Sequence, residues 1–79
     1  MYTRIHEPIA VCVQFDRHKT APLNFKWGHN LYGNLQTNLI WRQRRGKAML
    51  IYFGVNDGEN YFKLMFNSET LEWWLEETG

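Results

Sequence analysis

Two stretches in the second half of the chain alternate apolar side chains with other residues, and both are rich in aromatic rings. The first stretch is 49–55 (Met-Leu-Ile-Tyr-Phe-Gly-Val) and the second is 60–66 (Asn-Tyr-Phe-Lys-Leu-Met-Phe). Residues two apart on a β-strand point to the same face, so this period predicts strands. Asp57-Gly58 lies between the stretches and is typical of a tight turn. Together they predict an antiparallel hairpin whose first strand, apolar on both faces, is central in a sheet.

The rest of the chain shows the same alternation less clearly. Residues 9–15 and 22–27 alternate and are separated by the polar segment 16–21. Residues 31–45 also alternate, but Leu31, Leu35 and Leu39 recur at helical spacing as well, and segment 71–77 fits either structure. We therefore predict an all-β fold, a small antiparallel meander or barrel of five to six strands. The alternative is an α+β fold with a helix in 31–45 or at the C-terminus.

Length and composition restrict the protein to a few classes. Seventy-nine residues form one domain, 1–79, and five Phe, four Tyr and four Trp supply the buried area that so short a chain needs. The net charge of +1 gives no overall attraction to nucleic acid, and no apolar run approaches the roughly 20 residues that span a bilayer. The lone Cys12 excludes an internal disulfide, and no apolar signal-peptide segment follows the polar stretch 1–7. We expect a cytoplasmic protein that does not associate with membranes.

Several short, mostly aromatic segments follow one another along the chain in a characteristic order. Phe15-Asp16 is followed by Pro-Leu-Asn-Phe-Lys-Trp-Gly at 22–28, by Trp41-Arg42 before a basic stretch, and by 52–55, 60–64, 66–67, Thr70 and Trp73. This order resembles a family of short bacterial β-rich domains of unknown function, some of them encoded near DNA-damage-tolerance genes. The resemblance implies a small bacterial β-rich domain. It implies no catalytic or binding residue.

The sequence contains no catalytic or metal-binding arrangement. His6, His18 and His29 lie in separate polar segments, too far apart for the close ligand pairs that zinc prefers. Cys12 lies between two valines of a predicted strand, which indicates a buried, unreactive thiol. We expect a protein that is not an enzyme and that uses no metal or cofactor.

The strongest indication of binding is the basic segment 42–47. It contains Arg42, Arg44, Arg45 and Lys47, whose charges can contact phosphates, and Trp41 beside them can stack on a base. The same segment is also typical of a solvated hairpin loop. Three further cations would extend the patch if the fold brings them close: Arg17, Lys19 and Lys26.

Trp73-Trp74 is the second indication of binding. Adjacent residues of a strand point to opposite faces, so one ring is expected to face outward, and Trp74 is the candidate anchor. The same ring is equally able to cover the second face of the sheet. The first hypothesis is thus a small non-catalytic interaction module that binds a protein partner or itself, as a homodimer, through its sheet face and exposed aromatics. The alternative is a nucleic-acid-binding module that uses segment 42–47 and Trp41.

Overall fold

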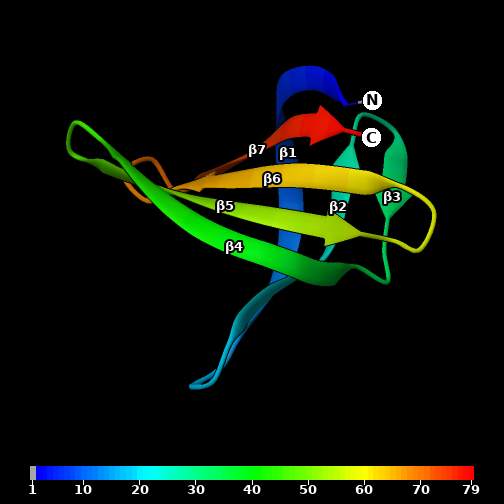
Figure 1. Ribbon diagram of the computed structural model, residues 1–79, viewed down its shortest axis with the longest axis horizontal. Coiled ribbons are helices and arrows are strands. Elements are labelled where there is room, and N and C mark those ends of the chain that lie inside the picture. The colour runs from blue at the N-terminus through cyan, green and yellow to red at the C-terminus, as the bar shows by residue number, and fades with distance from the viewer. Residues whose placement is uncertain (1) are drawn as a thin grey trace.

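A computed structural model describes residues 2–79, so Met1, the first residue of the predicted domain, lies outside the described residues. Within them, seven antiparallel strands form one open sheet in the order β3-β2-β1-β7-β6-β5-β4 (Figure 1). No helix occurs in this range, and hence none that could cross a bilayer. The strands are β1 (Thr3–Phe15), β2 (Thr20–Trp27), β3 (Asn30–Tyr32), β4 (Gln36–Arg45), β5 (Ala48–Asn56), β6 (Tyr61–Asn67) and β7 (Glu72–Thr78).

The all-β prediction is confirmed, but the predicted strand number is too low and the barrel is not formed. Segment 31–45 spans two strands, β3 and β4, which lie at opposite edges of the sheet. Gly33 and Asn34 separate them, and Asn34 has a φ of 52°, which ends an extended strand. The backbone N–H of Leu35 donates to the carbonyl of Leu23 at 3.4 Å, so β2 approaches the start of β4. Within residues 2–79, β2 and β4 form no ladder, and the sheet stays open.

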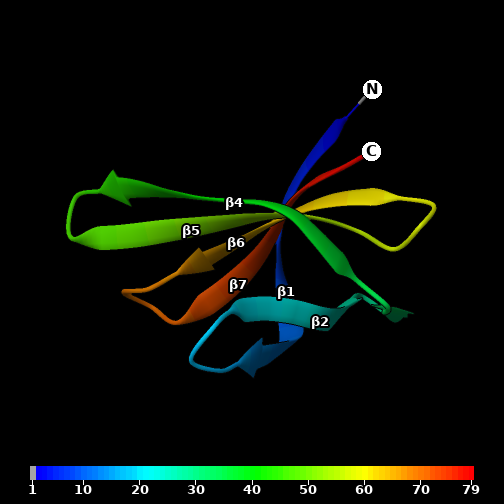
Figure 2. The same ribbon diagram turned by 60° about the horizontal axis from the view of Figure 1, so that its bottom comes forward.

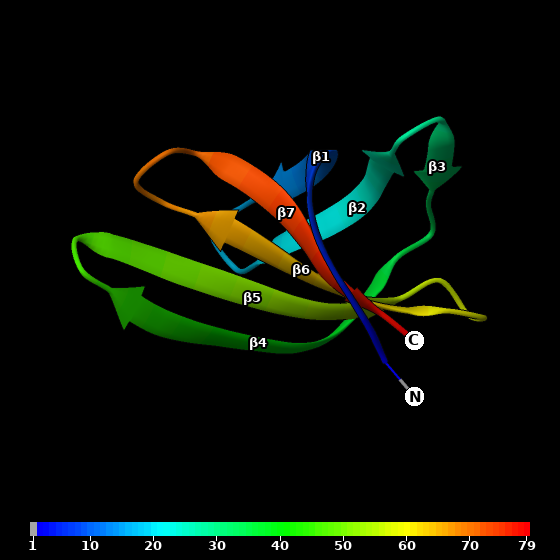
Figure 3. The same ribbon diagram turned by 90° about the horizontal axis from the view of Figure 1, so that it is seen from above.

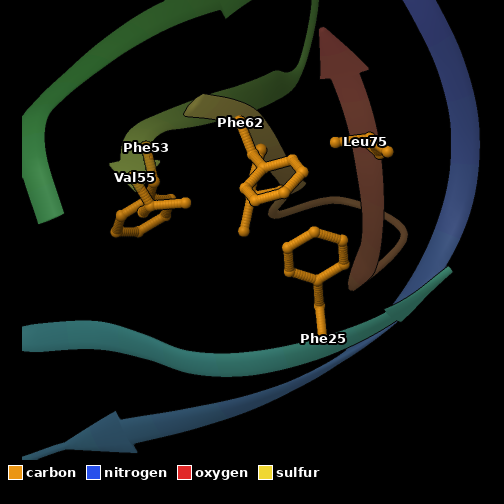
Figure 4. Close-up of a cluster of buried hydrophobic side chains, with 6 residues drawn as sticks. Phe25, Phe53, Val55, Phe62 and Leu75 are labelled. Carbon is orange, nitrogen blue, oxygen red and sulfur yellow. The ribbon is translucent and has the colours of Figure 1, made fainter. Parts of the chain in front are cut away.

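The sheet twists until one of its faces closes over itself. β1 and β2 cross behind β5 and β6 in Figure 1, and the turned views in Figures 2 and 3 show the strands fanning around this crossing. Phe25 of β2 meets Phe62 of β6 with ring centroids 5.0 Å apart, although β2 and β6 are not neighbours in the sheet. We call this the first face. Its buried core is Phe25, Phe53, Val55, Phe62, Leu64 and Leu75 (Figure 4).

The opposite side, the second face, carries a smaller apolar cluster. Leu50, Tyr52 and Met65 are buried there, with Trp41 and Trp74 half-buried against them. β5 therefore buries side chains on both faces, between β4 and β6, as predicted for a central strand.

A bulge in β1 aims His6 at the second face. Arg4 pairs with Glu77 and Glu7 with Leu75, so two residues of β1 lie opposite one residue of β7. His6 has a φ of 53° within this bulge. Bulges change the direction of one side chain while the strands on either side stay paired. The imidazole is thereby placed over the ring of Trp74, with centroids 4.6 Å apart.

Candidate functional site

The predicted basic loop is mostly strand. Arg42, Arg44 and Arg45 belong to β4, and only Gly46 and Lys47 form the turn to β5. The turn is tight because Gly46 adopts a φ of 60°, which glycine accepts without strain. The arginines therefore follow the alternation of a strand rather than gathering at a loop tip.

This alternation divides the predicted site between the two faces. Arg42 is opposite Ile51 and Arg44 is opposite Met49, on the first face. Trp41 is opposite Tyr52 on the second face, and Arg45 shares that side. Trp41 and its neighbour Arg42 thus do not form one binding surface. The strand period alone contains this information, so the sequence held the signal that would have separated them.

The two tryptophans of the predicted site lie together on the second face. Trp41 stacks on Tyr52 with centroids 5.1 Å apart, and Lys63 Nζ lies 5.5 Å and 5.2 Å from the two ring centroids. A cation over aromatic rings is held by their negative faces. Trp74 is half-buried beneath the imidazole of His6. Its neighbour in the sequence, Trp73, points to the first face instead. Intramolecular neighbours therefore cover part of both Trp41 and Trp74.

A groove on the second face, lined by Tyr52 and Trp74, has a balanced charge. Its volume is about 580 Å³. Lys63 Nζ lies 3.3 Å from Glu77 Oε2, and His6 Nδ1 lies 2.6 Å from Glu76 Oε2. We call it the mixed-charge groove; its charged lining consists of Arg4, Arg45, Lys63, Glu72, Glu76 and Glu77, besides His6. As many carboxylates as cations line it, so it offers little attraction to a phosphate chain.

A second groove opens on the first face, where the β1–β2 turn stands over the sheet. Its volume is about 470 Å³. Half-buried Trp73 lies on its floor, 5.0 Å from Phe66 and 5.4 Å from Phe53 between ring centroids. Exposed Arg17 and Lys19 from the turn and Arg42 from β4 form its rim. We call this the cationic groove; its apolar lining is Phe15, Ile40, Ile51, Phe53, Phe66 and Trp73.

Asp16 gives the turn that carries two of these cations its shape. Its carboxylate accepts hydrogen bonds from the backbone N–H groups of His18, at 2.7 Å, and Lys19, at 2.8 Å. Chiefly these two bonds lower the pKa of Asp16 below its ordinary value of 3.8, so the group is ionised at neutral pH. Asp16 is the one carboxylate among the residues that line the cationic groove. The three rim cations outnumber it, and Arg44 lies farther along the same face.

Tertiary structure thus replaces part of the predicted site. Arg17 and Lys19 join Arg42, as expected if the fold brought them together, whereas Lys26 does not line the groove. The aromatic ring beside these cations is Trp73 rather than Trp41. Nothing in the local sequence around Trp73 points to this, because its neighbours Glu72 and Trp74 are directed to the other face.

Two further candidates from the sequence are the thiol of Cys12 and the possible metal ligands. Cys12 is exposed on β1, so the expectation of a buried thiol is wrong; it lies on the side of the strand opposite Val11, which packs against the core. Between residues 2 and 79, no three His, Cys, Asp or Glu side chains are grouped so as to hold a metal ion.

Comparison with protein-family models, curated proteins and solved structures found no match to this chain. The resemblance to bacterial β-rich domains therefore stays a prediction.

Proposed function

We propose that the protein is a non-catalytic binding module that holds single-stranded nucleic acid in the cationic groove. The observation that carries this proposal is one groove in which three cations, Arg17, Lys19 and Arg42, surround a half-buried tryptophan. In such a site the cations contact phosphates, and a base stacks on the ring of Trp73. Each stacked base contributes about 1–3 kcal/mol to binding.

Shape and charge favour a single strand over a duplex. The faces of duplex bases are covered by their neighbours, so they are not free to stack on Trp73. The groove volume of about 470 Å³ lies within the roughly 300–1,000 Å³ typical of ligand sites, so the groove suits one short segment of a nucleic-acid strand. The alternation of β4 places Arg44 beyond Arg42 on the same face, where the phosphate chain would leave the groove.

The test compares two arginines of the same strand that lie on opposite faces. The protein is titrated with a labelled single-stranded oligothymidylate at several salt concentrations. With three phosphate contacts, log K should fall with log salt with a slope of about −2, and Arg42→Gln should make that slope shallower by about 0.7. Arg45→Gln is the matched control and should leave both affinity and slope unchanged. Absence of binding at low salt, or equal loss in both variants, would refute the proposal.

A second candidate is the interaction module that binds a protein partner or itself through its sheet face. The observation that favours it is the mixed-charge groove, where half-buried Trp74 is the aromatic anchor. Partner residues of both signs would match its lining. Trp74→Ala should then abolish an observed complex while leaving oligonucleotide binding intact. An exposed free thiol at Cys12 persists in reducing surroundings, which supports a cytoplasmic setting for either function.

A further inference from the structure

One long edge of the sheet has backbone groups without a partner strand. β4 ends the strand order and pairs only with β5, and it is ten residues long. The opposite edge, β3, has only three residues. A long edge strand presents a row of N–H and C=O groups that another strand can bind. The available part of β4 begins near Leu39, because β2 approaches its first residues.

Large apolar side chains are exposed on both sides of this edge. Leu39 is 61% exposed and Ile40 is 45% exposed. Leu39 is opposite Gly54 and Ile40 is opposite Phe53, so the two side chains lie on different faces of the sheet. A strand added beside β4 would cover both of them at once. Side chains of β4 also line the two grooves, Ile40 and Arg42 the cationic groove and Arg45 the mixed-charge groove, but neither groove uses the unpaired backbone groups of the edge.

The two ends of the edge carry opposite charges. The end of β4 and the turn that follows it, together called the basic hairpin, carry Arg44, Arg45 and Lys47, all exposed. Gln36, at the start of β4, pairs with Asn56, at the end of β5, so the turn that follows β5 lies at the other end of the edge. This turn, which we call the acidic turn, carries Asp57 and Glu59. Hydrogen bonds from the backbone N–H groups of Asn60 and Glu59 lower the pKa of Asp57, so it is ionised at neutral pH.

We infer that β4 pairs antiparallel with β4 of a second copy of this chain, forming one sheet continuous across a twofold axis. Antiparallel pairing sets the basic hairpin of each copy beside the acidic turn of the other, so both ends attract. Parallel pairing would set the two basic hairpins together and repel. Centred near Trp41, the antiparallel arrangement places Leu39 beside the partner's Gln43, and Arg44 lies beyond this paired segment, toward the end of the partner that carries its acidic turn. The same surface meets itself, which gives a closed dimer and not a fibre.

This proposal goes beyond the nucleic-acid function, since it rests on the backbone groups of an edge, whereas the nucleic-acid proposal rests on the cations and the tryptophan of a groove. The arginines also have an alternative role: charges on an edge strand can prevent pairing. The two roles differ in one measurable property. Charges that only prevent association would keep the protein monomeric, and reversing them would promote association. If the charges instead select antiparallel pairing, the protein dimerises, and reversing one of them weakens the dimer.

The test measures mass in solution by light scattering and sedimentation over a wide range of concentration, at low and moderate salt. The chain should dimerise, and salt should weaken the dimer. Arg44→Glu should raise the dimer dissociation constant on the order of tenfold or more, because each substitution acts at both ends of a twofold interface. Glu59→Lys should do the same. The double variant, with both charges exchanged, should dimerise again.

A second measurement reports on the edge itself. Backbone amides of β4 that face outward should exchange quickly in dilute protein and slowly in concentrated protein. Amides of β6, inside the sheet, are the control and should not change with concentration. A protein that stays monomeric at every concentration, or a dimer that neither charge reversal affects, overturns the proposal. Circular dichroism of each variant shows that the fold is retained.

Discussion

Phe25 is the side chain on which the closure of the first face depends. It is fully buried, and its ring lies edge-on to Phe62, with centroids 5.0 Å apart, and stacked on Tyr32 at 5.1 Å. Phe→Ala substitutions in a core cost about 3–5 kcal/mol. At roughly 0.05–0.15 kcal/mol per residue, a chain of this length has only about 4–12 kcal/mol of unfolding free energy. Phe25→Ala should therefore remove a large share of it and lower Tm by at least about 12 °C.

The assay is urea unfolding followed by tryptophan fluorescence. Phe25→Leu is the milder variant: it keeps an apolar side chain but loses two ring contacts, each contributing about 0.5–1.5 kcal/mol, so it should cost about 1–3 kcal/mol. Leu31→Ala, at a side chain 71% exposed on β3, is the control and should change stability by less than about 0.5 kcal/mol. If Phe25→Leu and Leu31→Ala have the same effect, β2 does not pack across β6 and the account of the core is wrong.

Two further predictions concern the β5–β6 hairpin. Gly58 has a φ of +98°, so Gly58→Ala should destabilise the fold by about 1–3 kcal/mol in urea unfolding, whereas Gly33→Ala, where the φ is ordinary, should be nearly neutral. Burial, and then the charge of Glu77, raise the pKa of Tyr61 above 10.0. The folded state therefore favours the neutral phenol of Tyr61. The contribution of this neutral side chain to the free energy of unfolding is complete below pH 10 and is lost as pH rises through the pKa of the folded state. Tyr61→Phe should reduce this alkaline loss of stability, and an unchanged pH profile would contradict the assignment.

The strands whose side chains alternate most regularly were the most predictable elements. Residues 49–55 fall within β5 and residues 61–66 within β6, which begins one residue later than predicted, and the turn between the two strands contains Asp57 and Gly58 as predicted. Alternation is a local property, because it follows from the geometry of an extended backbone. Segment 31–45 was harder: its alternation favoured a strand, but Leu31, Leu35 and Leu39 also recur at helical spacing. Its division into β3 and β4 depends on where each strand finds a partner, which is not a local property.

The candidate site was predicted only in part, and for a related reason. The basic residues of β4 were recognised, but their separation between faces was not, although alternation places Arg42 and Arg45 on opposite sides. The cationic groove could not be derived in this way. Arg17 and Trp73 are far apart along the chain, and they share one groove because the β1–β2 turn stands over β7 and β6.

By itself, the sequence determined that this chain forms antiparallel strands, which faces of those strands are apolar, and that β5 lies inside a sheet. These properties follow from residue spacing and from how much apolar surface each strand must bury. Only the tertiary structure decided that the sheet stays open, that β4 is left as a free edge, and that three distant cations meet around Trp73. Twist, bulges and the closing of β2 over β6 set these relations, and they depend on contacts between residues remote in the chain.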